Sequence, residues 1–359
     1  MKIKAEISSL QFYTVLFLGR VFALVTYIMS MRTELASTDR VISSLLAGLY
    51  MLATAIPLAV LIRQNSSSSV LERAEKISPL LGKVLCVVYF AELIYLGVIT
   101  SVRFGIFTGS VMFPDTNIMF FIFMMLAFSA FTAFRGIEGL GRSAFVMLFP
   151  VLLSLIFVFS AQSGRGDILN MTVPLASSAE GIVSTAVFTA SRTGELLFVA
   201  LIPQNVKKQK SSHIFIFILC IAAVMVASEL VMSLVLGSYG ATQLYGMYSL
   251  SVLARLGFIE RLDAFFSCVW LLCAGIRCAL TLFTCSVLLR FFTKKSRNAV
   301  YICLCAVLIF LGALPLSGNL IGLSWLINAP VTQIFYLLGV VVIPLTVMLC
   351  ERVKKREKA

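Results

Sequence analysis

Ten long apolar segments constrain this chain more than any other feature. Each is long enough to cross about 30 Å of hydrocarbon as an α-helix. They cover approximately residues 9–30, 40–62, 80–103, 116–134, 139–160, 181–202, 212–236, 262–291, 299–316 and 329–350. The chain is 60% hydrophobic and 13% charged, whereas soluble domains are about half apolar and a quarter charged. This excludes a soluble enzyme or a disordered chain and predicts a single all-α polytopic membrane domain over residues 1–359, with ten transmembrane helices. The runs do not alternate as barrel strands do.

The positive charges predict the orientation of these helices. With a cytoplasmic N-terminus, 20 of the 29 Lys and Arg residues fall on the cytoplasmic side, six on the opposite side and three inside spans. Both termini are therefore expected in the cytoplasm. Because the positive residues are spread over several loops and the tail at 351–359, they indicate topology and contact with membrane lipids, and not binding to nucleic acid.

Neither a metal site nor a cofactor is expected. The nine cysteines form no C-x-x-C pair, and His213 is the only histidine. The sequence also lacks H-E-x-x-H and G-x-S-x-G motifs. We therefore expect no catalytic residues and do not expect an enzyme.

Ionisable side chains inside the spans are the first candidates for function, because a charge at membrane depth is costly unless it is paired or faces water. Six such residues occur: Arg20, Glu92, Arg192, Glu195, Glu229 and Arg277. Tyr95, one turn from Glu92, is a candidate for a pocket wall, although ordinary packing explains it equally well. Thr281 and Thr284 follow Arg277 by one and two turns and are expected to line the same cavity.

Two segments are predicted to unwind at membrane depth. The first span contains Gly19-Arg20, and the sixth contains residues 189–195, which include the candidates Thr189, Ser191 and Gly194. Broken backbone is tolerated in a membrane only where it lines a cavity or is buried in protein. Matching breaks five spans apart predict two halves of inverted topology, at about 9–160 and 181–350. Exposed N–H groups and carbonyls at the breaks suit a zwitterionic amino acid.

Each charged candidate also has a purely structural interpretation. Arg192 and Glu195 are spaced to form an ion pair within one helix, with no ligand. Arg20 serves equally well as a strut between helices. Glu92 either carries a proton or pairs with a buried arginine, and Arg277 either lines a cavity or pairs with a glutamate.

Three motifs carry a family resemblance. They are Phe134-Arg135-Gly136-Ile137-Glu138-Gly139-Leu140-Gly141-Arg142; the stretch 248–264, with Arg255, Glu260, Arg261 and Asp263; and the opening Ile7-Ser8-Ser9-Leu10-Gln11. Together with Trp270, the chain length and the ten spans, they resemble the spore germination GerAB family of permease-like proteins. Physically, Glu138 and Arg142 are spaced to pair across one helical turn. The charged cluster of Glu260, Arg261 and Asp263 is suited to docking a partner or to capping a helix.

The resemblance implies a fold like that of the amino acid–polyamine–cation transporters, which is LeuT-like with a five-plus-five inverted repeat and helices 1 and 6 broken. It also implies a B-type subunit of a nutrient germinant receptor in the inner membrane of a bacterial endospore. The implied partners are an A-type membrane subunit and a C-type lipoprotein, and the implied ligand is a small nutrient, usually an amino acid. The alternative function is an ion-coupled secondary amino-acid transporter, with a proton carried by Glu92 or Glu195.

Overall fold

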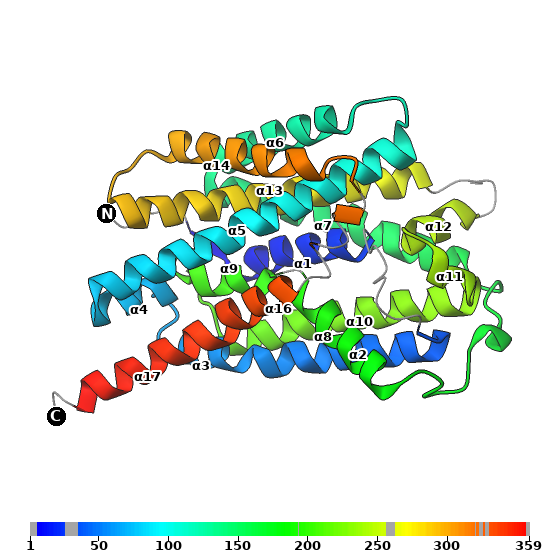
Figure 1. The fold of residues 1–359 in the computed structure, drawn as a ribbon, viewed down its shortest axis with the longest axis horizontal. Helices are drawn as coiled ribbons and strands as arrows, with labels where there is room; N and C mark the ends of the chain where they lie inside the picture. The colour runs from blue at the N-terminus through cyan, green and yellow to red at the C-terminus, as the bar shows by residue number, and fades with distance from the viewer. Residues whose placement is uncertain are drawn as a thin grey trace.

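The structure is a bundle of long helices lying roughly alongside one another (Figure 1). It is a computed structural model that describes residues 6–25, 35–192, 194–255, 263–319, 321–322, 326 and 330–356. Within these residues the only strands are β1 (Ile7–Ser8) and β2 (Val206–Lys207), which pair in parallel. The all-α class is confirmed.

A helix or a pair of helices occupies each of the ten predicted apolar segments. These are α1 (Ser9–Val25), α2 (Ser37–Thr54) with α3 (Ile56–Gln64), α5 (Pro79–Phe107), α6 (Ile118–Phe134), α7 (Gly136–Ala161), α8 (Ala179–Ser191) with α9 (Glu195–Leu201), α10 (Ser211–Leu236), α13 (Asp263–Thr293), α14 (Asn298–Ala313), and α16 (Pro330–Leu337) with α17 (Ile343–Arg356). In the described part of the chain, seven helices are long and apolar enough to cross a membrane, or eight if α8 and α9 form one bent span. Because α1 and α6 are shorter, the count of ten spans and the inverted repeat stay predictions.

Several short elements lie where the sequence suggested only loops or continuous helix. They are α4 (Val70–Ile77), α11 (Tyr239–Thr242), α12 (Gly246–Leu253), the 3-10 turns η2 (Ile168–Asn170), η3 (Pro203–Asn205) and η4 (Leu314–Leu316), and the π-helical turns η1 (Thr108–Met112) and η5 (Leu338–Val342). Helix α4 has a clear local cause, because Ser69 and Glu72 form a reciprocal capping box at its start. The π-turn η5 matters for the site described below.

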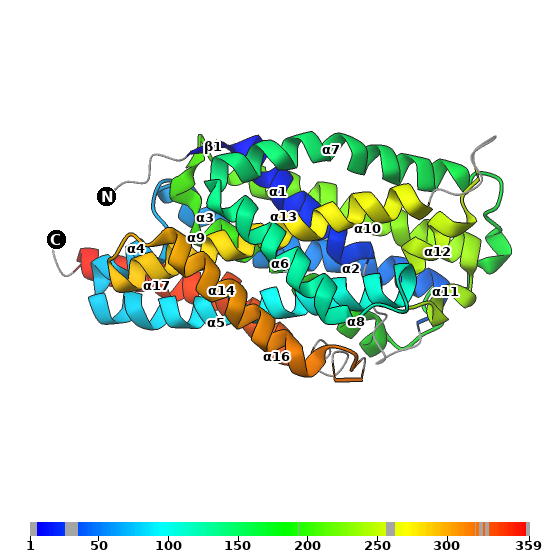
Figure 2. The same cartoon turned by 90° about the horizontal axis from the view of Figure 1, so that it is seen from above.

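Helix α13 is the central element of the bundle. Inside its most apolar window 83% of the residues are buried, against 28% for α14. It contacts α1, α5, α6, α7 and α14, and Figure 2 shows it lying between α7 and the layer of α5 and α14. The outer helices present large exposed apolar side chains such as Phe131 on α6 and Phe149 on α7. Helix α13 therefore carries interior side chains, and the outer helices present the surface expected to face lipid.

The predicted break in the first span is wrong for the described residues. Helix α1 runs without interruption through Gly19 and Arg20 to Val25. The helix does not need to unwind, because the charge of Arg20 is met by side-chain and backbone groups of other helices. The break in the sixth span is present: α8 and α9 bend by 44° where they meet.

Two family motifs lie together at one end of the bundle. Ser8 and Gln11 cap α1 reciprocally, since the Gln11 side chain accepts from the Ser8 amide (3.1 Å) and the Ser8 hydroxyl accepts from the Gln11 amide (3.2 Å). Gly136 begins α7 with a φ of +75°, a conformation that favours glycine. A Cβ on Gly141 would lie 3.1 Å from Ile7, so this glycine lets α7 approach the start of α1.

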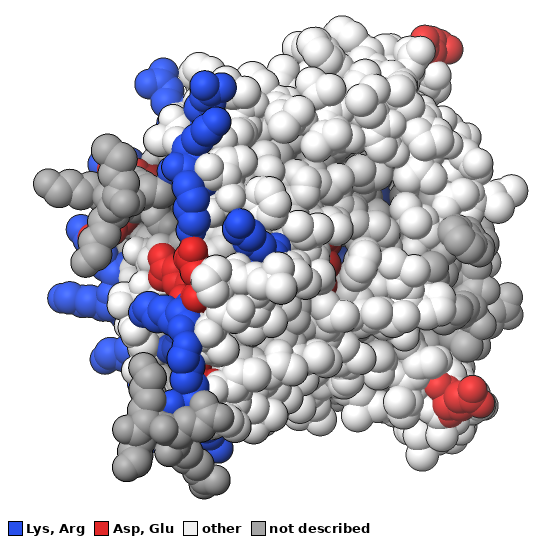
Figure 3. Space-filling view, turned by 60° about the vertical axis from the view of Figure 1, so that its left-hand side comes forward, with Lys and Arg blue, Asp and Glu red and all other residues white. Residues whose placement is uncertain are grey.

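Lys and Arg side chains gather at the end of the molecule where α1 begins and α17 ends. On the face in Figure 3 a broad belt free of charge adjoins this basic end. A belt of this kind is typical of a multi-pass membrane protein, and the basic end is the one that the positive-inside rule would place in the cytoplasm.

Candidate functional site

Glu195 stands at the centre of the buried charges. It begins α9, directly after the bend, and its carboxylate forms an ion pair and a hydrogen bond with Arg277 of α13. Its second oxygen lies 3.8 Å from Nη1 of Arg20 on α1. All three side chains are at most 4% exposed. One carboxylate thus joins three spans in the interior of the bundle, and two arginines share it.

The two arginines also receive backbone and hydroxyl oxygens. Arg20 donates to the carbonyl of Thr189 (3.1 Å), and Arg277 donates to the carbonyl of Gly19 (2.9 Å) and to Oγ1 of Thr100 (3.2 Å). Buried charges are tolerated when hydrogen bonds and counter-charges satisfy them in this way. Both arginines make helix-to-helix contacts beside a continuous α1, and their predicted role in ligand binding stays a prediction.

The ends of the two half-helices explain why these charges lie at the bend. The carbonyl of Thr189 lies in the last turn of α8, where helix carbonyls lack a partner in their own helix, and the Arg20 guanidinium fills that role. Glu195 lies in the first turn of α9, where a negative charge is favoured. Gly194 supplies the bend with a left-handed φ of +62°.

The other polar candidates at the bend use their side chains locally. The Ser191 hydroxyl donates to the Val187 carbonyl of its own helix (2.7 Å). Arg192 is 5% exposed, and its guanidinium lies over the Phe188 ring, 5.0 Å from the centroid. Glu195 pairs with arginines of other helices, so the sequence hypothesis of a simple Arg192–Glu195 pair does not account for its role.

Thr281 and Thr284 are buried on α13. Each donates to the carbonyl four residues earlier in its own helix, at 3.0 and 2.8 Å. Helix α13 itself thus accepts from both hydroxyls, and the place of these threonines in a ligand site stays a prediction.

Glu92 lies on α5 away from the Glu195 network. It is 1% exposed, and neither carboxylate oxygen has a hydrogen-bond partner among the described residues. A Cβ on Gly339, in the π-turn η5, would lie 2.5 Å from its Oε2 and closer still to Leu197 of α9. The π-turn also presents the Gly339 carbonyl to the Tyr89 hydroxyl, at 2.8 Å. Gly339 therefore makes room for the carboxylate beside α9.

Tyr95 makes packing contacts, which was the second of the two roles considered for it. Its hydroxyl lies 2.6 Å from Oγ1 of Thr332 and 3.1 Å from the carbonyl of Leu326. These contacts tie α5 to the tenth apolar segment. They do not aim the hydroxyl at Glu195.

Arg103 was missed by the sequence reasoning, which counted it among external loop charges. It lies within α5 and is 4% exposed, and its Nε and Nη2 atoms have no hydrogen-bond partner among the described residues. A signal was available: the apolar run continues past Arg103 through Phe104, Ile106 and Phe107, which places the arginine inside the helix.

An aromatic cluster lies one turn beyond Arg103. The Trp270 ring is 4.2 Å from that of Phe107 and 4.8 Å from that of Phe22, measured between centroids. Its indole N–H donates to the carbonyl of Phe22 (3.1 Å), and Tyr245 packs edge-on against Phe107. The cluster thus joins α1, α5 and α13.

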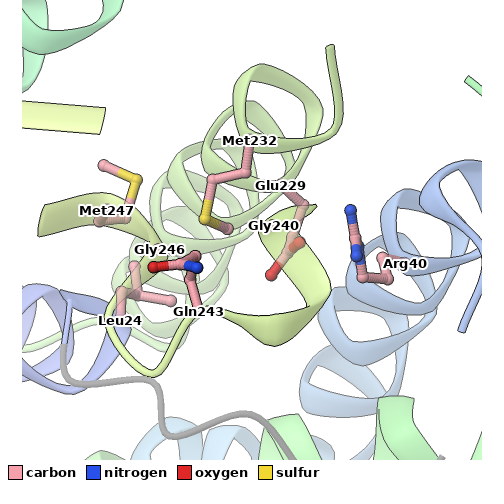
Figure 4. Close-up of a pocket in the computed structure, with 8 residues that line it drawn as sticks. All are labelled: Leu24, Arg40, Glu229, Met232, Gly240, Gln243, Gly246 and Met247. Atoms are coloured by element: carbon pink, nitrogen blue, oxygen red, sulfur yellow. The ribbon is translucent and has the colours of Figure 1, made fainter. Parts of the chain in front are cut away.

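A second pair of charges faces a small pocket near that end. Figure 4 shows Glu229 of α10 and Arg40 of α2 among the residues that line it. Arg40 donates to the carbonyl of Gly237 (3.0 Å) and to Oγ of Ser233 (3.4 Å). The pocket holds about one water molecule, which is too little for an amino acid in this conformation.

The family-motif residues lie at the ends of the bundle, away from Glu195. Glu138 and Arg142 pair at 3.7 Å across one turn of α7, as their spacing predicts, and both are exposed. Arg255 is exposed at the end of α12. Glu260 and Arg261 lie outside the described residues. Within the described part of the chain, no three His, Cys, Asp or Glu side chains come together to hold a metal ion.

Comparison with known families decides the relationship that these motifs suggest. The family described as "Spore germination protein", a family of spore permeases, matches residues 6–321. The chain belongs to this family. No curated protein matches this germination permease significantly.

Solved structures show which fold this germination permease has. A mutant of the manganese transporter of Eremococcus coleocola matches with a TM-score of 0.57 at 15% identity, covering 95% of this chain and 78% of that one. The same transporter in complex with an aromatic bis-isothiourea substituted compound matches with a TM-score of 0.57 at 14% identity, covering 94% and 77%. The germination permease thus shares the fold of this manganese transporter. At this identity the likeness concerns the fold alone.

Proposed function

We propose that this germination permease is the B-type subunit of a spore nutrient-germinant receptor and binds a small nutrient, such as an amino acid, at the bend between α8 and α9. The observation that carries the proposal is the position of Glu195 at a bend that two arginines from other spans also reach. A family of germination permeases supplies the biological setting. In LeuT-like transporters, interrupted membrane helices form the substrate site, and the bend between α8 and α9 is an interruption of this kind.

The charge balance at the bend suits an amino acid. Two guanidinium groups share one carboxylate, which leaves positive charge in the interior. A nutrient carboxylate entering beside Glu195 would balance it, and the nutrient ammonium group would meet Glu195 or a carbonyl of the bend. Binding would then draw α1 and α13 into a new arrangement, to the extent that the nutrient binds one arrangement more tightly than the other.

The proposal includes the location and the partners. The subunit lies in the inner membrane of the endospore, with both termini in the cytoplasm, in agreement with the basic end of the molecule. An A-type membrane subunit and a C-type lipoprotein complete the receptor and transmit the signal. The exposed motif residues Glu138, Arg142 and Arg255 are suited to contacts with these partners.

Spore germination tests the nutrient site. Glu195→Gln and Arg192→Ala are expected to shift the nutrient dose dependence at least tenfold, compared at equal amounts of the subunit in the spore membrane, since a bond to a charged group contributes about 1.5–3 kcal/mol. Glu180→Gln, which alters an exposed carboxylate on α8, is the matched control. If both site variants respond with the dose dependence of the parent, the proposed site is wrong.

A second function is favoured by one observation, the buried Glu92 without a hydrogen-bond partner. Such a carboxylate is a candidate proton carrier for a secondary amino-acid transporter. Purified protein in liposomes separates the two functions. Amino-acid flux driven by a proton gradient and lost in Glu92→Gln would establish transport, whereas binding without flux would establish sensing.

A further inference from the structure

Arg103 is a buried cation that forms no ion pair with the acidic side chains in the described part of the chain. It lies on the interior face of α5, 4% exposed, and its Nε and Nη2 atoms find no acceptor among the described residues. These two atoms lose their hydration without regaining a hydrogen bond there, which is energetically unfavourable. Residues held at such a cost are functional candidates, especially at membrane depth.

The charges nearest to Arg103 increase this cost. Arg192 and Arg277 are close enough to repel its guanidinium. Glu195, the acid of the central network, is already shared between Arg277 and Arg20. The space around Arg103 is therefore electropositive on balance.

The position of Arg103 relates it to the route into the site. Phe107 follows one turn later on the same face of α5 and belongs to the aromatic cluster with Trp270 and Tyr245. Thr100, nearly one turn earlier, accepts a hydrogen bond from Arg277. Arg103 thus lies between the aromatic cluster and the Glu195 network, where a solute passing the cluster would first meet a charge.

We propose that Arg103 binds the carboxylate group of the nutrient. The planar guanidinium presents paired N–H donors that match the two oxygens of a carboxylate. A carboxylate would also supply the counter-charge and the acceptors that the described residues do not give to Nε and Nη2 of Arg103. The inference rests on the proposed nutrient site and adds to it the residue that holds the carboxyl group of the nutrient.

Thermal unfolding of the purified full chain in lipid nanodiscs tests the assignment without knowledge of the nutrient. The probes are sodium acetate, acetamide as its neutral counterpart, and additional sodium chloride at the same ionic strength. Acetate is expected to raise Tm in a saturable manner, while acetamide does not. In Arg103→Gln the apparent affinity for acetate is expected to fall at least tenfold. Arg63→Gln, an exposed arginine at the end of α3, should behave like the parent.

A second variant keeps the test decisive if Arg103→Gln does not fold. Arg103→Lys retains the charge but loses the paired donors, and it is expected to bind acetate about tenfold more weakly. Equal acetate affinity in the parent and in either Arg103 variant overturns the assignment, as does a shift by chloride that acetate does not exceed. If the Glu195 and Arg192 variants keep the nutrient dose dependence of the parent while acetate binding still depends on Arg103, the proposed nutrient site is wrong and the Arg103 assignment stands.

Discussion

The first and sixth membrane segments carry the same kind of feature and fold differently. Each has an arginine beside a glycine in the middle of an apolar run, yet α1 passes through Gly19 and Arg20 intact whereas the sixth segment bends at Gly194. In α1 the charge is met by Glu195 and by the Thr189 carbonyl of other helices. In the sixth segment a left-handed glycine turns the chain itself. A buried charge therefore does not by itself break a helix; a partner elsewhere can satisfy it.

The comparison assigns different tasks to the two segments. Helix α1 is a continuous strut whose backbone and side chain contact two other spans, through Gly19 and Arg20. The bend between α8 and α9 provides the acid and the open carbonyl that hold this strut. Substitutions on either side of the contact distinguish these tasks.

The largest effect is expected at the shared acid. Glu195→Gln removes the charge that pairs with both arginines and leaves two buried guanidinium groups uncompensated. Breaking a buried ion pair in this way costs about 3–5 kcal/mol. Unfolding of the purified protein in mild detergent measures the loss, with Glu180→Gln as the control expected within about 0.5 kcal/mol of the parent. Equal stability of the two variants would show that the network holds nothing together.

Substitution of two buried threonines should cost different amounts of stability, because one bonds to a charged side chain and the other only to its own helix. Thr100→Val removes an acceptor of Arg277 and is expected to cost about 1.5–3 kcal/mol, because the bond involves a charged group. Thr281→Val removes only a bond to a carbonyl of its own helix and is expected to cost less than about 1 kcal/mol. The same unfolding measurement ranks them, and a reversed order would place Arg277 elsewhere.

A smaller effect on stability is expected at the glycine in each of the two segments, Gly194 in the sixth and Gly19 in the first. Gly194→Ala places a side chain in a left-handed conformation and is expected to destabilise the protein by about 1–2 kcal/mol. Gly19→Ala lies in regular helix with its Cβ at least 3.5 Å from the nearest atoms of Arg277, so it should be neutral or stabilise by up to about 1 kcal/mol. Equal losses in the two variants would indicate that α1 also bends at Gly19.

Hydropathy was enough to place the ten helical segments, because the backbone of an apolar run of membrane length satisfies its hydrogen bonds only as a helix when the run does not alternate as barrel strands do. The reciprocal spacing of Ser8 and Gln11 and the pair of Glu138 and Arg142 are also local and readable in the sequence. The break at Gly19 was wrong because the partners of Arg20 come from segments 169 and 175 residues away, and a single sequence does not show which helices meet.

The candidate site was predicted in its charges but not in its connections. Arg20, Glu195 and Arg277 were named because each is costly in a membrane, but their meeting depends on the packing of α1, α9 and α13. The place of Thr281 and Thr284 in the site stays a prediction, and spacing alone does not reveal that each hydroxyl donates to its own helix. Arg103 was missed because the third segment was ended too early.

A double-mutant cycle between Glu195→Gln and Arg277→Gln tests the central contact most directly, with the cycle between Glu195→Gln and Arg20→Gln beside it. Unfolding free energies of the four variants in each cycle give the two coupling energies. We expect a coupling of about 1–3 kcal/mol for Glu195 with Arg277, and a smaller one for Arg20 at 3.8 Å. Additive effects in both cycles would contradict the account, since they would mean that the acid at the bend does not hold either arginine.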